Sequence, residues 1–369
     1  LAKKEVQAKE TALQKAIDAF QDKMPKVFDP FAGGGAIPLE VARLGCKSFG
    51  NDINPVAHII QKCGLEFPQK YGKPITFSKH EFIKNYGQKE WEQVSNDNLV
   101  YKNGNAVAVN IFNRLSYDVE YYATKLLAET ERQIGHLYPS DKNGNKPIAY
   151  YWARVGKCSN PSCNAEVPLL KRFALCDTST RKFSLQPHIT GNKIDFSIVN
   201  KIVEGSWISR GNLNCPCCGN TTDVKTLKNQ FIAKNTTHRL LAIIWENKDG
   251  KSYRIPSETD LKALEKIPTN ITRPREMMPI KYTQALPSCT WGLSEWGEMF
   301  TDRQMTFMNT IIESLENLKF TDNQDYNSII NAYMGILINR IAQRQTSFGI
   351  WDKSRENLKA IFGRQAISM

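Results

Sequence analysis

Four cysteines lie in two short clusters whose spacing is typical of a metal site. Cys158 and Cys163 lie in the segment CSNPSC, and Cys215 and Cys218 lie in CPCCG. Each segment contains Pro or Gly that favours a tight turn, so each can present two thiolates to one tetrahedral Zn²⁺ ion. A closed site of four cysteines is structural, so we expect the metal to hold a small ribbon together rather than to catalyse. Cys217, inside the second cluster, is an alternative ligand to its neighbours, and reduced cysteines in turns are the alternative to a metal site.

A second segment that could bind a ligand is a glycine-rich turn between a short apolar run and a helix-like segment. The turn reads DPFAGGG and consists of Asp29, Pro30, Phe31, Ala32, Gly33, Gly34 and Gly35. A Walker-type phosphate loop continues with Lys and then Ser or Thr, and the dinucleotide fingerprint needs a further glycine. This chain continues with Ala, Ile and Pro, so it fits neither pattern. What remains is a turn where the backbone approaches a ligand closely and a helix N-terminus faces that ligand.

Two carboxylates indicate which ligand this turn would bind. Asp29 ends the first predicted strand, where its negative charge repels a phosphate but suits an ammonium group or hydroxyls. Asp52 ends the next predicted strand, where a carboxylate can bind the two hydroxyls of a ribose. A nucleoside with an amino-acid tail meets both requirements, so the pattern predicts S-adenosylmethionine as the cofactor. The alternative is a tight turn between strand and helix in which the Asp is only a cap.

The turn and the segment after it also resemble a known family. DPFAGGGAIPLEVARLG followed by NDINPVA resembles the cofactor motif, and the acidic segment after it, of amino-methylating DNA methyltransferases. With the cysteine clusters, WGEMFTDRQ and the closing FGRQAISM, the chain is most similar to the adenine-specific DNA methylases that carry a zinc ribbon. The resemblance spans most of the chain.

The resemblance implies roles for individual residues of the turn. Asp52 would hold the ribose hydroxyls of S-adenosylmethionine, and Asn54 and Pro55 would pack near its adenine. The residues that would line the methionine and adenosine side of the cofactor are Asp29, Phe31, Gly33 and Gly35.

One motif that this chemistry requires is absent from the sequence. Methylation of an exocyclic amine uses Asp, Asn or Ser followed by Pro-Pro and an aromatic residue, which hydrogen-bond the amine and stack on a flipped base. No two prolines are adjacent in this chain, so it offers no catalytic residue of this kind. In the family that the chain resembles, the motif follows the FGRQA segment. We therefore expect a fragment or a split subunit whose catalytic motif lies in a missing segment or in a second chain.

The first functional hypothesis is the S-adenosylmethionine-binding part of a DNA methyltransferase that modifies N6 of adenine, in restriction–modification or phage defence. A methyltransferase acting on N4 of cytosine or on RNA would use the same turn. A different class of protein is a non-catalytic, zinc-containing nucleic-acid-binding module.

The elements that must position these residues predict an α/β fold. A strand from Val27, a helix over 37–44, a strand over 46–50 and a helix from Asn54 imply parallel strands. We expect the cofactor half of a Rossmann-like, doubly wound methyltransferase sheet with an inserted zinc-ribbon and target-recognition region. The expected domains are 1–150 for cofactor binding, 151–222 for the zinc ribbon, 223–295 for an irregular basic recognition region and 296–369 for helices.

The composition indicates which kind of partner the chain could bind. The 369 residues carry 49 Lys and Arg against 37 Asp and Glu, a net charge of +12. This excess favours a polyanionic partner, here DNA, because basic side chains neutralise phosphates. No apolar run approaches the length of a membrane span, and no export signal is recognisable. We expect a cytoplasmic, prokaryotic protein.

Overall fold

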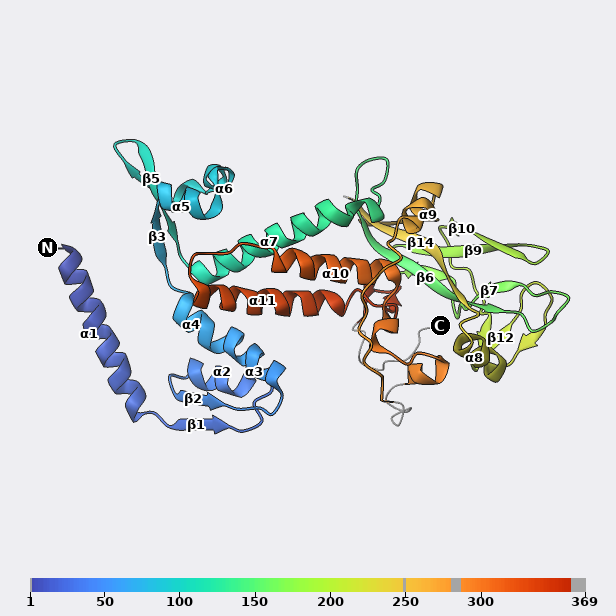
Figure 1. Cartoon of the computed structure of the whole chain (residues 1–369), viewed down its shortest axis with the longest axis horizontal. Coiled ribbons are helices and arrows are strands. Elements are labelled where there is room, and N and C mark those ends of the chain that lie inside the picture. The colour runs from blue at the N-terminus through green and yellow to red at the C-terminus, as the bar shows by residue number, and fades with distance from the viewer. Residues whose placement is uncertain (1, 248–249, 280–286, 360–369) are drawn as a thin grey trace. The chain divides into compact units, whose positions relative to one another are not determined.

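The structure divides into two compact units that are discontinuous in sequence (Figure 1). The computed structural model describes residues 2–247, 250–279 and 287–359. Unit 1 comprises Leu1–Leu126 and Asn317–Leu337, and unit 2 comprises Leu127–Glu316 and Ile338–Met369. Helices α7 (Arg114–Ile134) and α11 (Gln324–Ala342) contribute residues to both units.

The N-terminal part of unit 1 alternates helices with two short strands. Its elements are α1 (Ala2–Lys23), β1 (Lys26–Asp29), α2 (Ala36–Arg43), β2 (Lys47–Gly50), α3 (Pro55–Gln61) and α4 (Phe67–Tyr71). Strands β1 and β2 pair in parallel, with Phe28 opposite Phe49 and Asp29 opposite Gly50. Helix α3 begins where the Asn54 side chain accepts a hydrogen bond from the backbone N–H of Val56. The strand–turn–helix order and the parallel pairing confirm the prediction for this segment.

The second part of unit 1 is a small antiparallel sheet with helices. Its elements are β3 (Ile75–Ser78), α5 (Lys79–Tyr86), α6 (Gln88–Gln93), β4 (Leu99–Lys102) and β5 (Asn105–Ile111), with the strand order β3-β5-β4. A buried carboxylate, Asp118, accepts hydrogen bonds from the hydroxyls of Tyr86 at 2.6 Å and Tyr326 at 2.7 Å. Tyr326 belongs to α11, so one side chain of α7 joins helices that are far apart in the sequence.

Unit 2 is built on a four-stranded antiparallel sheet. In the order β15-β14-β6-β7, its strands are β15 (Gly250–Arg254), β14 (Thr237–Asn247), β6 (Pro147–Lys157) and β7 (Glu166–Pro168). One face contributes Ala153 and Ala242 to a large apolar core that includes Leu175 and Leu213. The other face carries a separate cluster of Leu240, Ile243 and Trp245, against which Leu264 packs.

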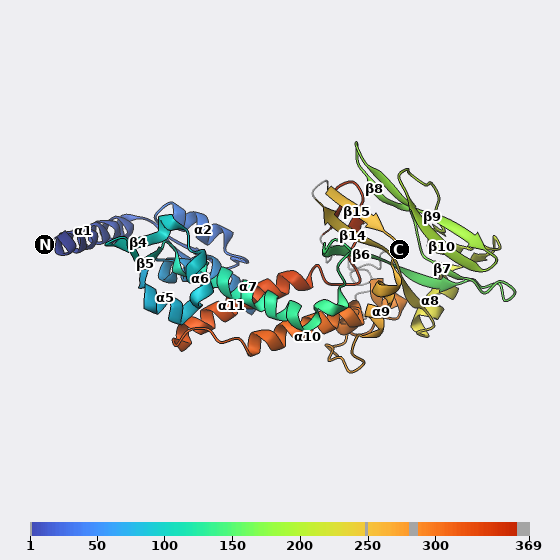
Figure 2. The same cartoon turned by 90° about the horizontal axis from the view of Figure 1, so that it is seen from above.

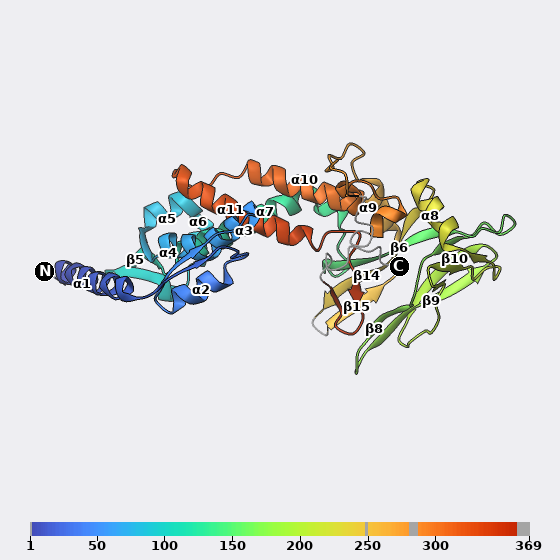
Figure 3. The ribbon, with the colours of Figure 1, turned by 90° about the horizontal axis from the view of Figure 1, so that it is seen from below.

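The remaining elements of unit 2 cover these two faces. Figure 2 shows β8, β9 and β10 on one side of β6 and β14 and helices α9 and α10 on the other side, and Figure 3 shows the same arrangement from below. The elements are β8 (Ala174–Asp177), β9 (Lys182–Thr190), β10 (Lys193–Val199), β11 (Ile208–Ser209), β12 (Asn212–Asn214), β13 (Thr221–Thr222), α8 (Val224–Ile232), α9 (Glu258–Glu265), α10 (Asp302–Glu316), β16 (Trp351–Asp352) and β17 (Asn357–Leu358).

The expectation of irregular structure over 223–295 is wrong. Helices α8 and α9 and strands β14 and β15 lie in this segment. Asp223 caps α8 by accepting hydrogen bonds from the backbone N–H groups of Lys225 and Thr226. A capping box of Ser257 and Asp260 begins α9. Strand β14 forms because it pairs with β6 from a distant part of the chain, which local composition does not reveal.

The chain is a mixed α/β protein whose sheets are small and mostly antiparallel. Within the described ranges, β1 and β2 form the only parallel pair, so the doubly wound, Rossmann-like sheet stays a prediction. The predicted domain boundaries also stay predictions, and the FGRQAISM segment lies outside the described residues. Among the helices that the structure describes, none is long and apolar enough to cross a membrane.

The buried carboxylate of Asp118 predicts a large loss of stability in Asp118→Ala. The substitution leaves two enclosed tyrosine hydroxyls without their acceptor, so it should lower the free energy of unfolding by about 3 kcal/mol. Urea unfolding followed by circular dichroism measures the change. Asp97→Ala, which removes an exposed carboxylate of the same unit, is the control and should cost less than about 0.5 kcal/mol. Equal stability of the two variants would contradict this role of Asp118.

Candidate functional site

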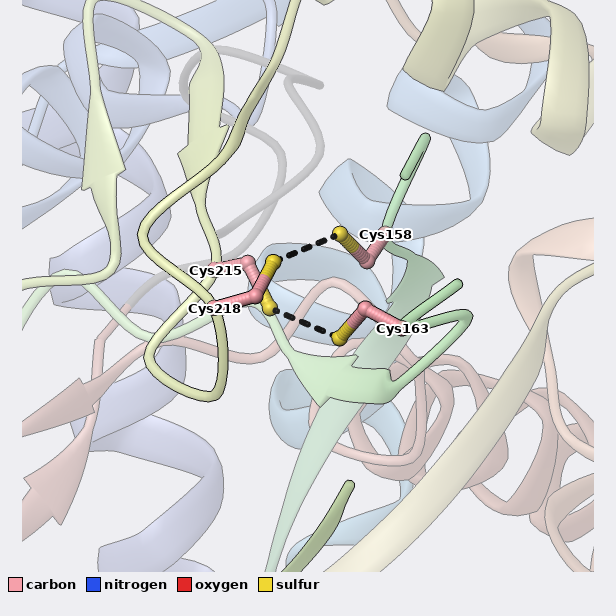
Figure 4. A group of neighbouring side chains, drawn as sticks. All are labelled: Cys158, Cys163, Cys215 and Cys218. Atoms are coloured by element: carbon pink, nitrogen blue, oxygen red, sulfur yellow. Dashed lines mark hydrogen bonds between the residues drawn. The ribbon is translucent and has the colours of Figure 1, made fainter. Parts of the chain in front are cut away.

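The four predicted cysteines converge on one point in unit 2 (Figure 4). The Sγ atoms of Cys158 and Cys218 lie 3.6 Å apart, and those of Cys163 and Cys215 lie 3.8 Å apart. All four sulfurs lie within 4.8 Å of one another. Four thiolates at a Zn–S distance of about 2.3 Å place neighbouring sulfurs about 3.8 Å apart in a tetrahedron. The four sulfurs could therefore bind a metal such as zinc.

Two turns at the ends of hairpins present these sulfurs. Cys158 and Cys163 lie in the turn between β6 and β7, where the Cys158 N–H donates to the carbonyl of Ala165 at 2.9 Å. Cys215 and Cys218 lie in the turn between β12 and β13. There the Gly219 N–H donates to the Cys215 carbonyl at 2.9 Å, and Gly219 has a φ of 74° that favours glycine. Each turn therefore directs two thiols to the same side.

Polar side chains that the sequence patterns did not single out connect the two turns. The Ser159 N–H donates to the Thr222 hydroxyl at 2.9 Å, and the Asn220 amide donates to the Ser159 hydroxyl at 2.9 Å. These residues lie beside the cysteines in sequence, but no local pattern indicates that they meet. The contacts position the two turns relative to one another in addition to any metal.

Cys217 lies outside the group of four. It packs, half-buried, against the apolar core of unit 2, where burial raises the pKa of its thiol to about 11. Burial also raises the pKa of Cys158 to about 12, whereas the Asn220 backbone N–H lowers the pKa of Cys218 to about 7. A metal ion that binds such a group must displace protons from its thiols.

The glycine-rich turn of unit 1 is held by the carboxylate of Asp52. One oxygen of Asp52 accepts a hydrogen bond from the Gly33 N–H at 2.9 Å, and the other accepts one from the Asn54 N–H at 2.8 Å. These N–H groups, of Asn54 and then Gly33, lower the pKa of Asp52. Asp29 accepts a hydrogen bond from the Phe31 N–H at 3.1 Å. Asp29 is the last residue of β1, whereas Asp52 lies just after β2, which ends at Gly50. Both carboxylates stabilise the backbone around the turn.

The glycines of the turn differ in what surrounds them. Gly33 has a φ of 52°, and a Cβ atom there would meet nothing within 4 Å, so its backbone faces open space. Gly35 has a φ of 88°, and a Cβ atom there would lie 3.0 Å from Cγ of Gln61. The Gln61 amide donates to the Gly33 carbonyl at 2.9 Å. The turn is thus packed from the α3 side and accessible at Gly33.

The other residues predicted for the cofactor lie around this turn. Phe31 is 85% exposed, whereas Ala32 is buried and its N–H donates to the Asn51 carbonyl at 2.9 Å. Pro30 is exposed. The side-chain oxygen of Asn54 is engaged as the cap of α3, so its place near an adenine stays a prediction.

The segment around this turn exposes an unusual amount of apolar surface. Within residues 11–60, only Ala32, Gly35, Pro38 and Ala57 are buried, with the side chain of residue 21 outside the description. The large apolar side chains that remain exposed there are Leu13, Ile17, Phe20, Phe28, Phe31, Ile37, Leu39, Leu44, Phe49, Ile53, Val56, Ile59 and Ile60. Parallel sheets normally have both faces covered, and two isolated strands are marginally stable at best. This segment therefore lacks a core of its own.

No protein-family model, curated protein or solved structure matches this chain. Its geometry provides two separate candidate sites: the cysteine group in unit 2 and the turn between β1 and α2 in unit 1.

The cysteine geometry predicts about one tightly bound zinc ion per chain. Cys163→Ser should lose this ion, because three thiolates no longer close the tetrahedron, while Cys217→Ser should retain it. Elemental analysis of purified protein after dialysis against a weak chelator measures the content. Equal zinc loss from both variants would show that Cys217 is also needed to bind the metal, and that the assigned set of four ligands is wrong.

Proposed function

We propose that the chain is the S-adenosylmethionine-binding part of a DNA methyltransferase that acts on N6 of adenine. The observation that carries the proposal is the glycine-rich turn after β1, with Gly33 accessible and two carboxylates beside it. The turn lies at the carboxyl end of a parallel strand, which is where ligands bind in open α/β sheets. The proposal places the protein in the cytoplasm of a prokaryote, in restriction–modification or phage defence.

The residues at this turn suit the predicted cofactor. Asp29 retains one carboxylate oxygen for the ammonium group, because its hydrogen bond to Phe31 uses only the other oxygen. Each oxygen of Asp52 accepts one hydrogen bond and has a further lone pair for a ribose hydroxyl. The backbone at Gly33 allows close approach, since no side chain stands in front of it. When bound, S-adenosylmethionine supplies a methyl group that its sulfonium activates.

The exposed apolar segment supports the further proposal that a missing segment or a second chain completes the sheet. That polypeptide would carry the Asp/Asn/Ser-Pro-Pro-aromatic motif and cover Phe28 and Phe49. A second copy of this chain does not suit this role. Strands related by a two-fold axis at a sheet edge run antiparallel, so β1 and its symmetry mate would not extend a parallel sheet.

A second candidate function is a non-catalytic, zinc-containing module that binds nucleic acid. The four-cysteine group and the net charge of +12 support it without any cofactor. Transfer to N4 of cytosine or to RNA would use the same turn, so the identity of the methylated base separates these alternatives from the main proposal.

Calorimetric titration with S-adenosylmethionine tests the cofactor site. The unaltered chain, with the polypeptide that carries the catalytic motif, should bind it. Asp29→Ala should bind roughly 10- to 150-fold more weakly, because one charge-assisted contact to the ammonium is lost. Glu40→Ala, on the nearby helix α2, is the matched control and should bind like the unaltered chain. If the unaltered chain gives no heat in the presence of that polypeptide, the proposal is refuted. If Asp29→Ala binds with unchanged affinity, another carboxylate binds the ammonium.

Transfer of a labelled methyl group to DNA tests whether the catalytic motif is supplied by a polypeptide other than this chain. The chain alone should transfer none, because the motif that positions the amine is absent from its sequence. Addition of the motif-bearing polypeptide should produce N6-methyladenine. Methylation by the chain alone would contradict the proposed division, and N4-methylcytosine would favour the alternative base.

A further inference from the structure

A pocket of about 330 Å³ lies in unit 2, on the face of the sheet opposite the large apolar core. Trp152 of β6 and His238 of β14 line it from the sheet. These two side chains come together because Arg154 pairs with His238, and Trp152 with Leu240, across neighbouring strands. Leu264 and Ile267 line the pocket at the end of α9, and Phe300 lines it just before α10.

The charged side chains at the pocket are already paired. Arg273 donates to the carbonyls of Gly297 at 2.8 Å and Phe300 at 2.9 Å and forms an ion pair with Asp302. Glu298 pairs with Lys234. These contacts pair the charges of Arg273, Asp302 and Glu298 within the protein.

Arg303 is also committed to the protein. It is buried, it donates to the Leu137 carbonyl at 3.2 Å, and its guanidinium lies 3.9 Å from the ring centroid of Tyr150. The same guanidinium lies 5.9 Å from the ring centroid of Trp152. Arg303 therefore supports the aromatic side chains of this face and is not positioned as a free cation.

Two polar groups of the pocket have no partner among the described residues: the indole N–H of Trp152 and the imidazole of His238. His238 is partly open to solvent, but desolvation by the surrounding protein and then the Arg154 guanidinium lower the pKa of its imidazole to about 4. The imidazole is therefore neutral near pH 7, with one nitrogen that donates and one that accepts. The pocket thus offers two donors, one acceptor, aromatic rings and apolar walls.

We propose that this pocket holds one unstacked base of a nucleic-acid strand. A nucleobase is planar and uncharged, has donors and acceptors along its edge, and stacks on aromatic side chains such as Trp152 and Phe300. The net charge of +12 favours the phosphate backbone that would deliver such a base. The inference rests on the nucleic-acid partner of the proposed function, and it adds a base-binding site in unit 2 that is separate from the cofactor turn.

Binding of two single-stranded oligonucleotides of equal length, one with bases and one fully abasic, tests the proposal on the full chain. Stacking of a base contributes roughly 1–3 kcal/mol, so the unaltered chain should bind the base-containing strand roughly 5- to 150-fold more tightly. Trp152→Leu should lose most of that ratio while its affinity for the abasic strand stays unchanged. Trp152→Phe, which keeps an aromatic ring, should retain most of it.

Further variants distinguish the effects of lost stacking, lost hydrogen bonds and misfolding on the binding ratio. His238→Leu should reduce the ratio, whereas His238→Gln, which keeps a donor and an acceptor, should retain more of it. Phe112→Leu alters an exposed aromatic side chain of unit 1 and should leave the ratio unchanged. Unchanged zinc content in each variant confirms that unit 2 is folded.

The outcomes distinguish this inference from the proposed function. Equal ratios in Trp152→Leu and the unaltered chain would overturn the base pocket and leave the cofactor site untouched. Failure of the unaltered chain to bind either strand would overturn both the pocket and the nucleic-acid partner. The calorimetric titration with S-adenosylmethionine tests whether the cofactor site exists, independently of these results.

Discussion

Four thiols from two separate turns lie within 4.8 Å of one another, which brings the β6–β7 and β12–β13 hairpins of unit 2 together at one point. Thiolates at such short distances repel one another unless a cation lies between them. Cys158 and Cys215 are also members of the large apolar core, so a metal bound there would stabilise the same hairpins as core packing does. Strand β6 contributes Ala153 to this core and Trp152 to the opposite face, so the β6–β7 turn and the pocket are attached to the same strand.

The candidate site of unit 1 is held by hydrogen bonds between carboxylates and backbone N–H groups rather than by an apolar core. Asp52 holds the glycine-rich turn through the N–H groups of Gly33 and Asn54. Around this turn the large apolar side chains of β1, α2 and α3 remain exposed. The segment therefore has a well-defined turn but little buried apolar surface, and the proposed function accounts for this with a further polypeptide that completes the sheet.

Local sequence patterns predicted the structural features that depend on residues close together in the chain. The parallel strands around the glycine-rich turn and the four cysteines followed from spacing and residue type. The contacts between distant segments were not predictable in this way. Local composition predicts an irregular segment where β14 forms, because the partner strand β6 is remote in sequence. The same pairing brings His238 near Trp152. The Asp118–Tyr326 contact joins residues 208 positions apart, and no local spacing indicates it.

The proposed function depends on S-adenosylmethionine binding at the turn between β1 and α2. Hydrogen–deuterium exchange of the chain, together with a polypeptide that carries the catalytic motif, tests this location when it is measured with and without S-adenosylmethionine. The amides from Phe31 to Gly35 and of Asn54 should exchange more slowly with the cofactor, and those of Cys158 and Cys215 should not change. Unchanged exchange at the turn, or protection confined to unit 2, would contradict binding at this turn.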